Sequence, residues 1–195
     1  MSKTDAGTNK KERNKNVRWV ITIFVITILI SAIISFASDS LMANSTMLVA
    51  FIILFVIVLV GIAFDIIGVA VTSADEKPFH SMAARKVPGA QESIRLLRNA
   101  ERVSSICNDV IGDICGVVSG SAAATIAAAV LRNFEFSLES LIPLAMSALV
   151  AGITVGGKAI GKTFAINSCT KIVYSVGKFI SFFNKKPSNK KKNRN

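Results

Sequence analysis

The chain has 195 residues, of which 51% are hydrophobic, and its formal net charge at pH 7 is +11. This combination excludes an ordinary soluble domain, because so apolar a chain also carries a strong excess of Lys and Arg. It indicates an all-α integral membrane protein whose basic segments lie outside the bilayer.

Four stretches are apolar enough to cross a membrane as helices. Residues 19–38, 40–64 and 140–157 carry no charge, and residues 103–131 carry only two acidic side chains. A helix needs about 20 residues to span the hydrocarbon core. We therefore predict transmembrane helices at 19–38, 41–72, 103–131 and 138–160.

The distribution of Lys and Arg predicts the orientation of these helices. Residues 1–18, a basic arm, contain six, residues 73–102 contain six, and residues 158–195 contain ten, whereas the loop 39–45 contains none and the loop 132–139 contains one. Basic loops stay on the cytoplasmic side. We expect a multi-pass protein of the plasma membrane with both termini in the cytoplasm.

Two segments outside the spans have amphipathic helical spacing. Residues 77–102 break at Pro78 and Pro88 into two short pieces, and residues 164–183 repeat the pattern before a basic tail, 184–195, that we expect to be disordered. We interpret 77–102 as a belt along the inner membrane surface; a cytoplasmic helical hairpin is the alternative. Its basic residues suit anionic lipid headgroups, and we expect no nucleic-acid partner: Arg85, Lys86, Arg95 and Arg98.

Small residues recur every four positions along the third span, which predicts a face that packs closely on another helix, within the bundle or across a homodimer. They are Gly112, Gly116, Gly120, Ala124 and Ala128. Asn108 continues this stripe, and Asp109 and Asp113 lie beside it one turn apart. A charge near the bilayer centre costs about 2.5–3.5 kcal/mol, so we expect both carboxylates to face the bundle interior.

A second acidic residue, Asp65, lies at a similar depth in the second span. From the rise per residue, Asp65 and Asp109 are both about 10 Å from the inner ends of their helices. Lys158 enters the same leaflet from the fourth span. Two interpretations stay open: Asp65, Asn108 and Asp109, with Asp113 added, form a cation site suited to Mg²⁺, or Lys158 neutralises one aspartate in a structural network.

Three strings carry a family resemblance: FDIIGVAVTSADEKPF, GAQESIRLLRNAERVSSICNDVIGD and GGKAIGKTFAINSCTKIVYSVGKFI. They are similar to the transmembrane domain of the CorB/CorC and cyclin M (CNNM) magnesium transporters, over about residues 50–183. The most specific part is KTFAINSCTKIVY. We therefore assign 41–183 to a CNNM-like domain, with 19–38 as an additional helix. The resemblance implies transport or binding of a divalent cation, magnesium first and cobalt second, in the inner half of the bundle.

The chain departs from that family at the ion-site positions. Lys158 stands where the family has a glutamate and Gly161 where it has a proline, Asp65 falls where serines and a glutamate occur, and Asn108 survives from an asparagine pair. We also expect no counterpart of the family's CBS pair. The alternative function is therefore a transport-inactive membrane scaffold or regulatory partner in which Lys158 replaces the bound cation.

Other kinds of site find little support. The residues form no recognisable catalytic arrangement, so we do not expect an enzyme. The only histidine, His80, is expected at the surface. The three cysteines, Cys107, Cys115 and Cys169, are expected to be free, because they lie within or on the inner side of the spans.

Overall fold

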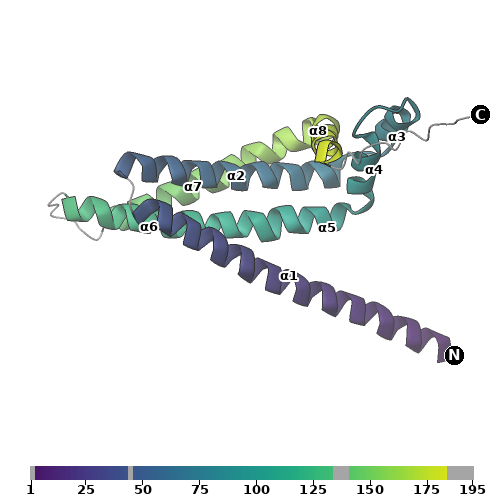
Figure 1. Cartoon of the computed structure of the whole chain (residues 1–195), viewed down its shortest axis with the longest axis horizontal. Helices are drawn as coiled ribbons and strands as arrows, with labels where there is room; N and C mark the ends of the chain where they lie inside the picture. The colour runs from purple at the N-terminus through teal and green to yellow at the C-terminus, as the bar shows by residue number, and fades with distance from the viewer. Residues whose placement is uncertain (1–2, 44–45, 134–140, 184–195) are drawn as a thin grey trace, which may run out of the picture. The chain divides into compact units, whose positions relative to one another are not determined.

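The computed structural model describes residues 3–43, 46–133 and 141–183, and over these ranges the chain is all-helical (Figure 1). Two compact units divide it: one holds the residues up to Val60 and Asp113–Gly152, the other Gly61–Gly112 and the residues from Ile153. The elements of the described ranges are α1 (Lys3–Ala43), α2 (Met47–Ser73), α3 (Lys77–Ala84), α4 (Ala90–Arg98), α5 (Ala100–Ser105), the π-helical segment η1 (Ile106–Gly112), α6 (Asp113–Asn133), α7 (Leu141–Asn167) and α8 (Cys169–Phe183).

Four of the helical stretches are long and apolar enough to cross a membrane, as predicted. They are Val17–Ser38, Met47–Ser73, Ala100–Leu131 and Leu141–Asn167. Two predicted boundaries were wrong. The second span begins at Met47 rather than 41, because α1 continues to Ala43, and the fourth continues past 160 to Asn167. Positions 138–140 of the predicted fourth span, and the predicted tail 184–195, lie outside the described residues.

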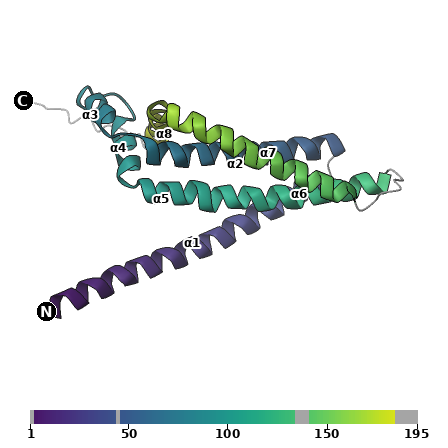
Figure 2. The ribbon, with the colours of Figure 1, turned by 180° about the vertical axis from the view of Figure 1, so that it is seen from behind.

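The first unit contains α1 as one unbroken helix of 41 residues, which includes most of the predicted basic arm (Figure 2). Within this unit α1 packs on α6. Its apolar side chains nevertheless stay largely uncovered, since Phe24 is 66% and Phe36 76% exposed. A side of this kind fits contact with lipid, because the hydrocarbon core supplies the apolar surroundings that water does not.

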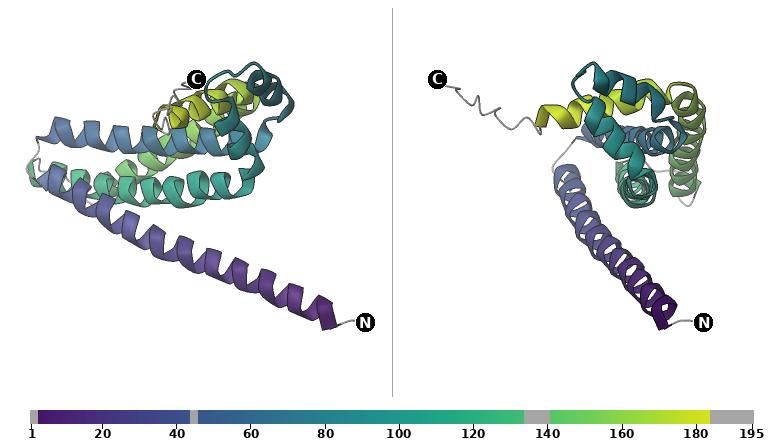
Figure 3. Two further views of the ribbon diagram at one scale, coloured as in Figure 1. Left: turned by 45° about the vertical axis from the view of Figure 1, so that its right-hand side comes forward. Right: turned by 90° about the vertical axis from the view of Figure 1, so that its right-hand side faces the viewer.

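The second unit has its core where the short helices meet the ends of α2 and α8. Phe79 of α3 is fully buried, and Ile94 and Leu97 of α4 pack with it against Val71 of α2 and Val173 of α8. Figure 3 shows the helices that carry this core, with α8 in yellow beside α4 in teal. The predicted helical pieces of 77–102 are therefore confirmed as α3 and α4. Phe79, Ile94 and Leu97 fill a protein core, and the position of these helices along the inner membrane surface stays a prediction.

The turn between α3 and α4 depends on a glycine. Gly89 has a φ of 88°, in the left-handed region that residues with a Cβ rarely adopt. A Cβ added there would also lie only 2.6 Å from the Lys178 Cα of α8. Both the backbone conformation and the close approach of α8 therefore require glycine at this position.

Candidate functional site

Three helical segments of the second unit surround the predicted site: the second half of α2, η1 and the second half of α7. Isoleucines of α2 lie against glycines of α7. A Cβ at Gly161 would be 2.8 Å from Ile66 Cγ1, and one at Gly157 would overlap Ile62. Glycine lets the two helices approach closely, which places Lys158, next to Gly157, beside the face of α2 that carries Asp65.

Lys158 and Asp65 form an ion pair. The Lys158 Nζ lies 3.8 Å from Asp65 Oδ1, and the two side chains are 27% and 17% exposed. The same Nζ also faces η1, because a Cβ added at Gly112 would lie 3.4 Å from it. The ammonium group thus lies between a carboxylate of α2 and the bare backbone of Gly112. The distance is too long for a direct hydrogen bond, so the contact is electrostatic.

Asn108 packs against the backbone of α2 one turn beyond Asp65. A Cβ added at Gly68 would overlap the Asn108 Oδ1, so this glycine makes the space in which the amide lies. The Asn108 Nδ2 donates to Ser104 Oγ at 3.3 Å. Its Oδ1 is buried and has no hydrogen-bond partner among the described residues. A buried oxygen of this kind is an available acceptor or ligand atom.

Asp109 and Asp113 do not join this cluster. Both side chains are exposed, and the ion pairs found in the described ranges include neither of them. The expectation that they face the bundle interior is therefore not met within this chain. For Asp113 the cause is η1, which precedes it: an extra residue in one helical turn rotates the residues after it by about 100°, so its spacing counted on a regular α-helix fails.

The small-residue stripe breaks at the same place. Gly112 is buried, but Gly116 and Gly120 have no heavy atom within 4 Å of an added Cβ, and Ala124 is exposed. The buried side of α6 is instead formed by other residues, Cys115, Val118, Ser119, Ala122, Ala123, Ile126 and Ala127. Of the two packing partners expected for the stripe, a helix of the same bundle is wrong for Gly116 and Gly120, and a second copy stays a prediction.

The residues brought together do not fit a magnesium site. The part of the chain that the structure describes holds no group of three or more His, Cys, Asp and Glu able to hold a metal ion. Mg²⁺ requires a near-octahedral set of oxygen ligands. Here Asp65 already faces an ammonium group, and the other two aspartates point elsewhere. The donor set left beside Lys158 is one carboxylate and one amide oxygen.

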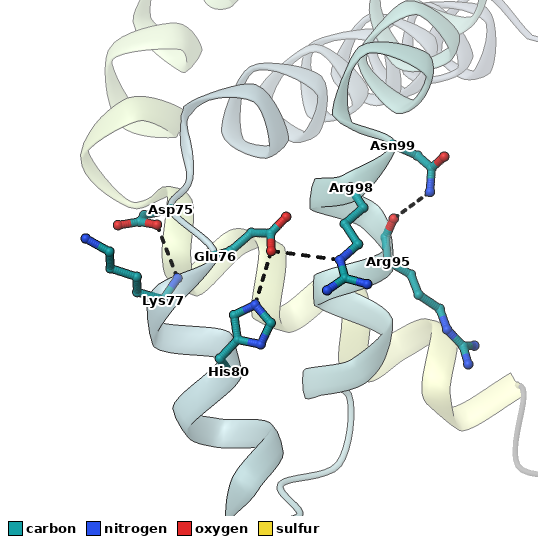
Figure 4. A network of polar contacts seen from close by, with 7 residues as sticks. All are labelled: Asp75, Glu76, Lys77, His80, Arg95, Arg98 and Asn99. Atoms are coloured by element: carbon teal, nitrogen blue, oxygen red, sulfur yellow. Dashed lines mark hydrogen bonds and ion pairs between the residues drawn. The ribbon is translucent and has the colours of Figure 1, made fainter.

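A polar network on α3 and α4 was not predicted from the sequence (Figure 4). Glu76 Oε2 lies 3.1 Å from His80 Nε2 and 3.9 Å from Arg98 Nε, so one carboxylate links the two helices. All three side chains are more than a third exposed, and such surface pairs contribute at most about 1 kcal/mol. His80 is exposed, as expected, and we assign this network a structural role.

Of the three cysteines, Cys107 and Cys115 are buried and Cys169 is partly buried, and the described residues contain no disulfide between them. No protein-family model, curated protein or solved structure matches this chain. Its function therefore has to be argued from its own residues.

Proposed function

We propose that this multi-pass membrane protein is a transport-inactive scaffold or regulatory partner, in which the Lys158 ammonium replaces a bound cation. The single observation that supports this is the contact of 3.8 Å between Lys158 Nζ of α7 and Asp65 Oδ1 of α2. An ammonium group supplies the positive charge that a carboxylate in a membrane span needs. In a transporter of the CorB/CorC and CNNM kind, which the sequence resembles, a mobile cation would supply that charge.

The covalent attachment of Lys158 decides what such a site can do. A bound Mg²⁺ can leave, so a site that holds it can pass the ion onward, whereas an ammonium on α7 stays with the helix. A magnesium ion entering here would first have to displace the ammonium and then lose water, which Mg²⁺ does reluctantly. The pair therefore favours a fixed structure over an ion pathway.

A second candidate function, cation binding, rests on one different observation. The buried Asn108 Oδ1 has no hydrogen-bond partner within the described part of the chain, and amide oxygens are ligands for Mg²⁺. If Lys158 moved away, the site would offer two oxygen donors, Asp65 on α2 and Asn108 on η1, the latter lying against Gly68 one turn further along α2. The two functions are separated by neutralising Asp65 and Lys158, singly and together, and measuring stability with and without magnesium.

The proposed topology places both termini in the cytoplasm. We expect reporter fusions at residue 195 and after residue 75 to be cytoplasmic, and a fusion near residue 44 to be on the opposite side, because basic segments flank the first two and not the third. Activity of paired cytoplasmic and external reporters measures the sidedness. If the fusions at residues 44 and 195 reported the same side, the assignment of Lys158 to the inner leaflet would be wrong.

We also propose that a second copy covers the exposed small residues of α6. Gly116 has open space beside it, so Gly116→Leu does not clash within one chain but would block close approach of another helix. The expected result is a shift from dimer to monomer in detergent, measured by light scattering, with unchanged helix content. A dimer that survives Gly116→Leu would place the interface elsewhere.

A further inference from the structure

One face of helix α8 packs against the rest of the second unit, and the opposite face is exposed. Its Val173 and Gly177 are buried against α4, where the buried Ser93 hydroxyl lies 3.2 Å from the Val173 carbonyl oxygen. The opposite face carries Phe179 and Phe182, which are 66% and 77% exposed. Because the backbones of α4 and α8 touch at Gly89 and Gly177, the free face is held in a fixed position beside the α3–α4 turn.

A groove runs along this free face. Its volume is about 480 Å³, and the residues that line it are Pro88, Ser175, Lys178, Phe179, Ser181 and Phe182. Two aromatic rings and a proline form an apolar wall, with a lysine and two hydroxyls beside them. The Ser175 hydroxyl donates to the Lys171 carbonyl oxygen at 2.9 Å, which leaves Lys178 and Ser181 as the groups that can donate to a ligand.

We propose that this groove binds an anionic phospholipid of the inner leaflet. An acyl chain would lie against Phe179 and Phe182, and the phosphate would receive hydrogen bonds from Lys178 and Ser181. The proposal is independent of the Asp65–Lys158 pair, since it concerns a different face of the second unit. The volume of the groove is that of a site for a small organic group. The groove would therefore hold the lipid phosphate and the first part of one acyl chain.

The position of α8 along the chain supports a lipid as the occupant. Only Ser168 separates α8 from α7, whose stretch Leu141–Asn167 is apolar enough to cross a membrane. The first groove residue on α8, Ser175, therefore lies eight residues after the end of this apolar helix. Exposed aromatic rings at a membrane boundary lie among lipid headgroups and upper chain segments.

Charge complementarity decides for an anionic lipid. Among the described residues no acidic side chain lines the groove, and the exposed Arg85 and Lys86 lie three and two residues before its Pro88. The next acidic side chain along α4 is Glu92, which is half-buried and not part of the lining. The sequence after α8 adds six Lys and Arg and no Asp or Glu over residues 184–195. An anionic surface attracts each of these charges.

The test compares lipid binding by the whole protein in detergent, measured by native mass spectrometry with phosphatidylglycerol and phosphatidylcholine of identical chains. We expect a preference for phosphatidylglycerol that Lys178→Gln lowers about fivefold, the contribution of one basic residue near an anionic surface. Lys171→Gln is the matched control: the same charge change on an exposed residue of α8 outside the groove lining. It should leave the preference within a factor of two, by the general tolerance of surface positions.

Three further outcomes bear on the proposal. Phe182→Ala should weaken binding of both lipids, and inorganic phosphate alone should not displace phosphatidylglycerol, because the apolar wall contributes to affinity. Equal losses in Lys178→Gln and Lys171→Gln would overturn the proposal, since only net charge would then matter. So would a dimer that dissociates in Phe182→Ala while lipid binding is unchanged, because a second copy would then be the occupant of the groove.

Discussion

Replacement of Gly177 by alanine is expected to destabilise the protein by about 1–3 kcal/mol, the usual cost of forcing an extra methyl into a well-packed site. A Cβ at Gly177 would overlap the Ser93 hydroxyl and lie 2.7 Å from the Gly89 carbonyl oxygen. Two of the neighbours are backbone atoms, which cannot rotate away as a flexible side chain would. Helices α4 and α8 must therefore separate, and thermal unfolding in detergent, followed by circular dichroism, should show a lower midpoint.

Gly156→Ala is the matched control for this prediction. Gly156 lies within α7 and has no heavy atom within 4 Å of an added Cβ. The same methyl there should leave the unfolding midpoint unchanged or raise it, because alanine favours a helix over glycine by up to about 1 kcal/mol. If Gly177→Ala were equally harmless, the backbone contact between α4 and α8 would not exist in solution, and the groove beside Lys178 would lose its fixed geometry.

The number and type of the long helices could be predicted because length and apolar composition alone determine them. The ends could not. The uncharged run 140–157 predicted a fourth span that ends at 160, yet α7 continues past it to Asn167. Lys158 and Lys162 can lie within one helix, because a long aliphatic stem lets the charged group reach polar surroundings. A charged residue in the sequence therefore indicates that its side chain has polar surroundings, but it is a poor indicator of where a helix ends.

Periodicity identified which faces of the short helices are apolar, but not what covers them. The spacing of Phe79, Ile94 and Leu97 fits contact with lipid as well as contact with protein. The structure buries all three in the core of the second unit. On α8, in contrast, the apolar Phe179 and Phe183 of the predicted amphipathic segment lie exposed. Local pattern cannot distinguish these cases, because the partner comes from a distant part of the chain.

The candidate site shows a similar division. The sequence placed Lys158 in the same leaflet as Asp65, and the two side chains lie 3.8 Å apart. The match in depth between Asp65 and Asp109 did not bring their side chains together, and spacing on a regular α-helix failed for Asp113, which follows the π-helical η1. Nothing in the letters ICNDVIG marks a π-helical turn. Gly68 is the one available signal, since a glycine within a long apolar helix often marks a close approach.

Replacement of Asp65 by asparagine is expected to lower the free energy of unfolding by about 2–3 kcal/mol without any metal present. Loss of one partner from a buried ion pair costs about 3–5 kcal/mol, and the smaller value follows from the partial exposure of Lys158 and Asp65, 27% and 17%. Asp109→Asn is the matched control, because Asp109 is exposed and forms no ion pair within the described ranges. It should change stability by less than about 0.5 kcal/mol.

The double replacement Asp65→Asn with Lys158→Met separates the two proposed functions. If Lys158 serves only to neutralise Asp65, the double variant has no unpaired charge left at this level and should regain most of the lost stability, since apolar replacement of a whole buried pair is often neutral. Magnesium should not then raise the melting temperature of the unmodified protein.

If Asp65 and Asn108 bind a cation, magnesium should stabilise the unmodified protein by an amount that grows with its concentration. Asp65→Asn should abolish that stabilisation, and removal of Lys158 alone should strengthen it, because the competing ammonium is gone. Melting curves of the four proteins over a magnesium series therefore decide between a fixed ammonium and a mobile ion.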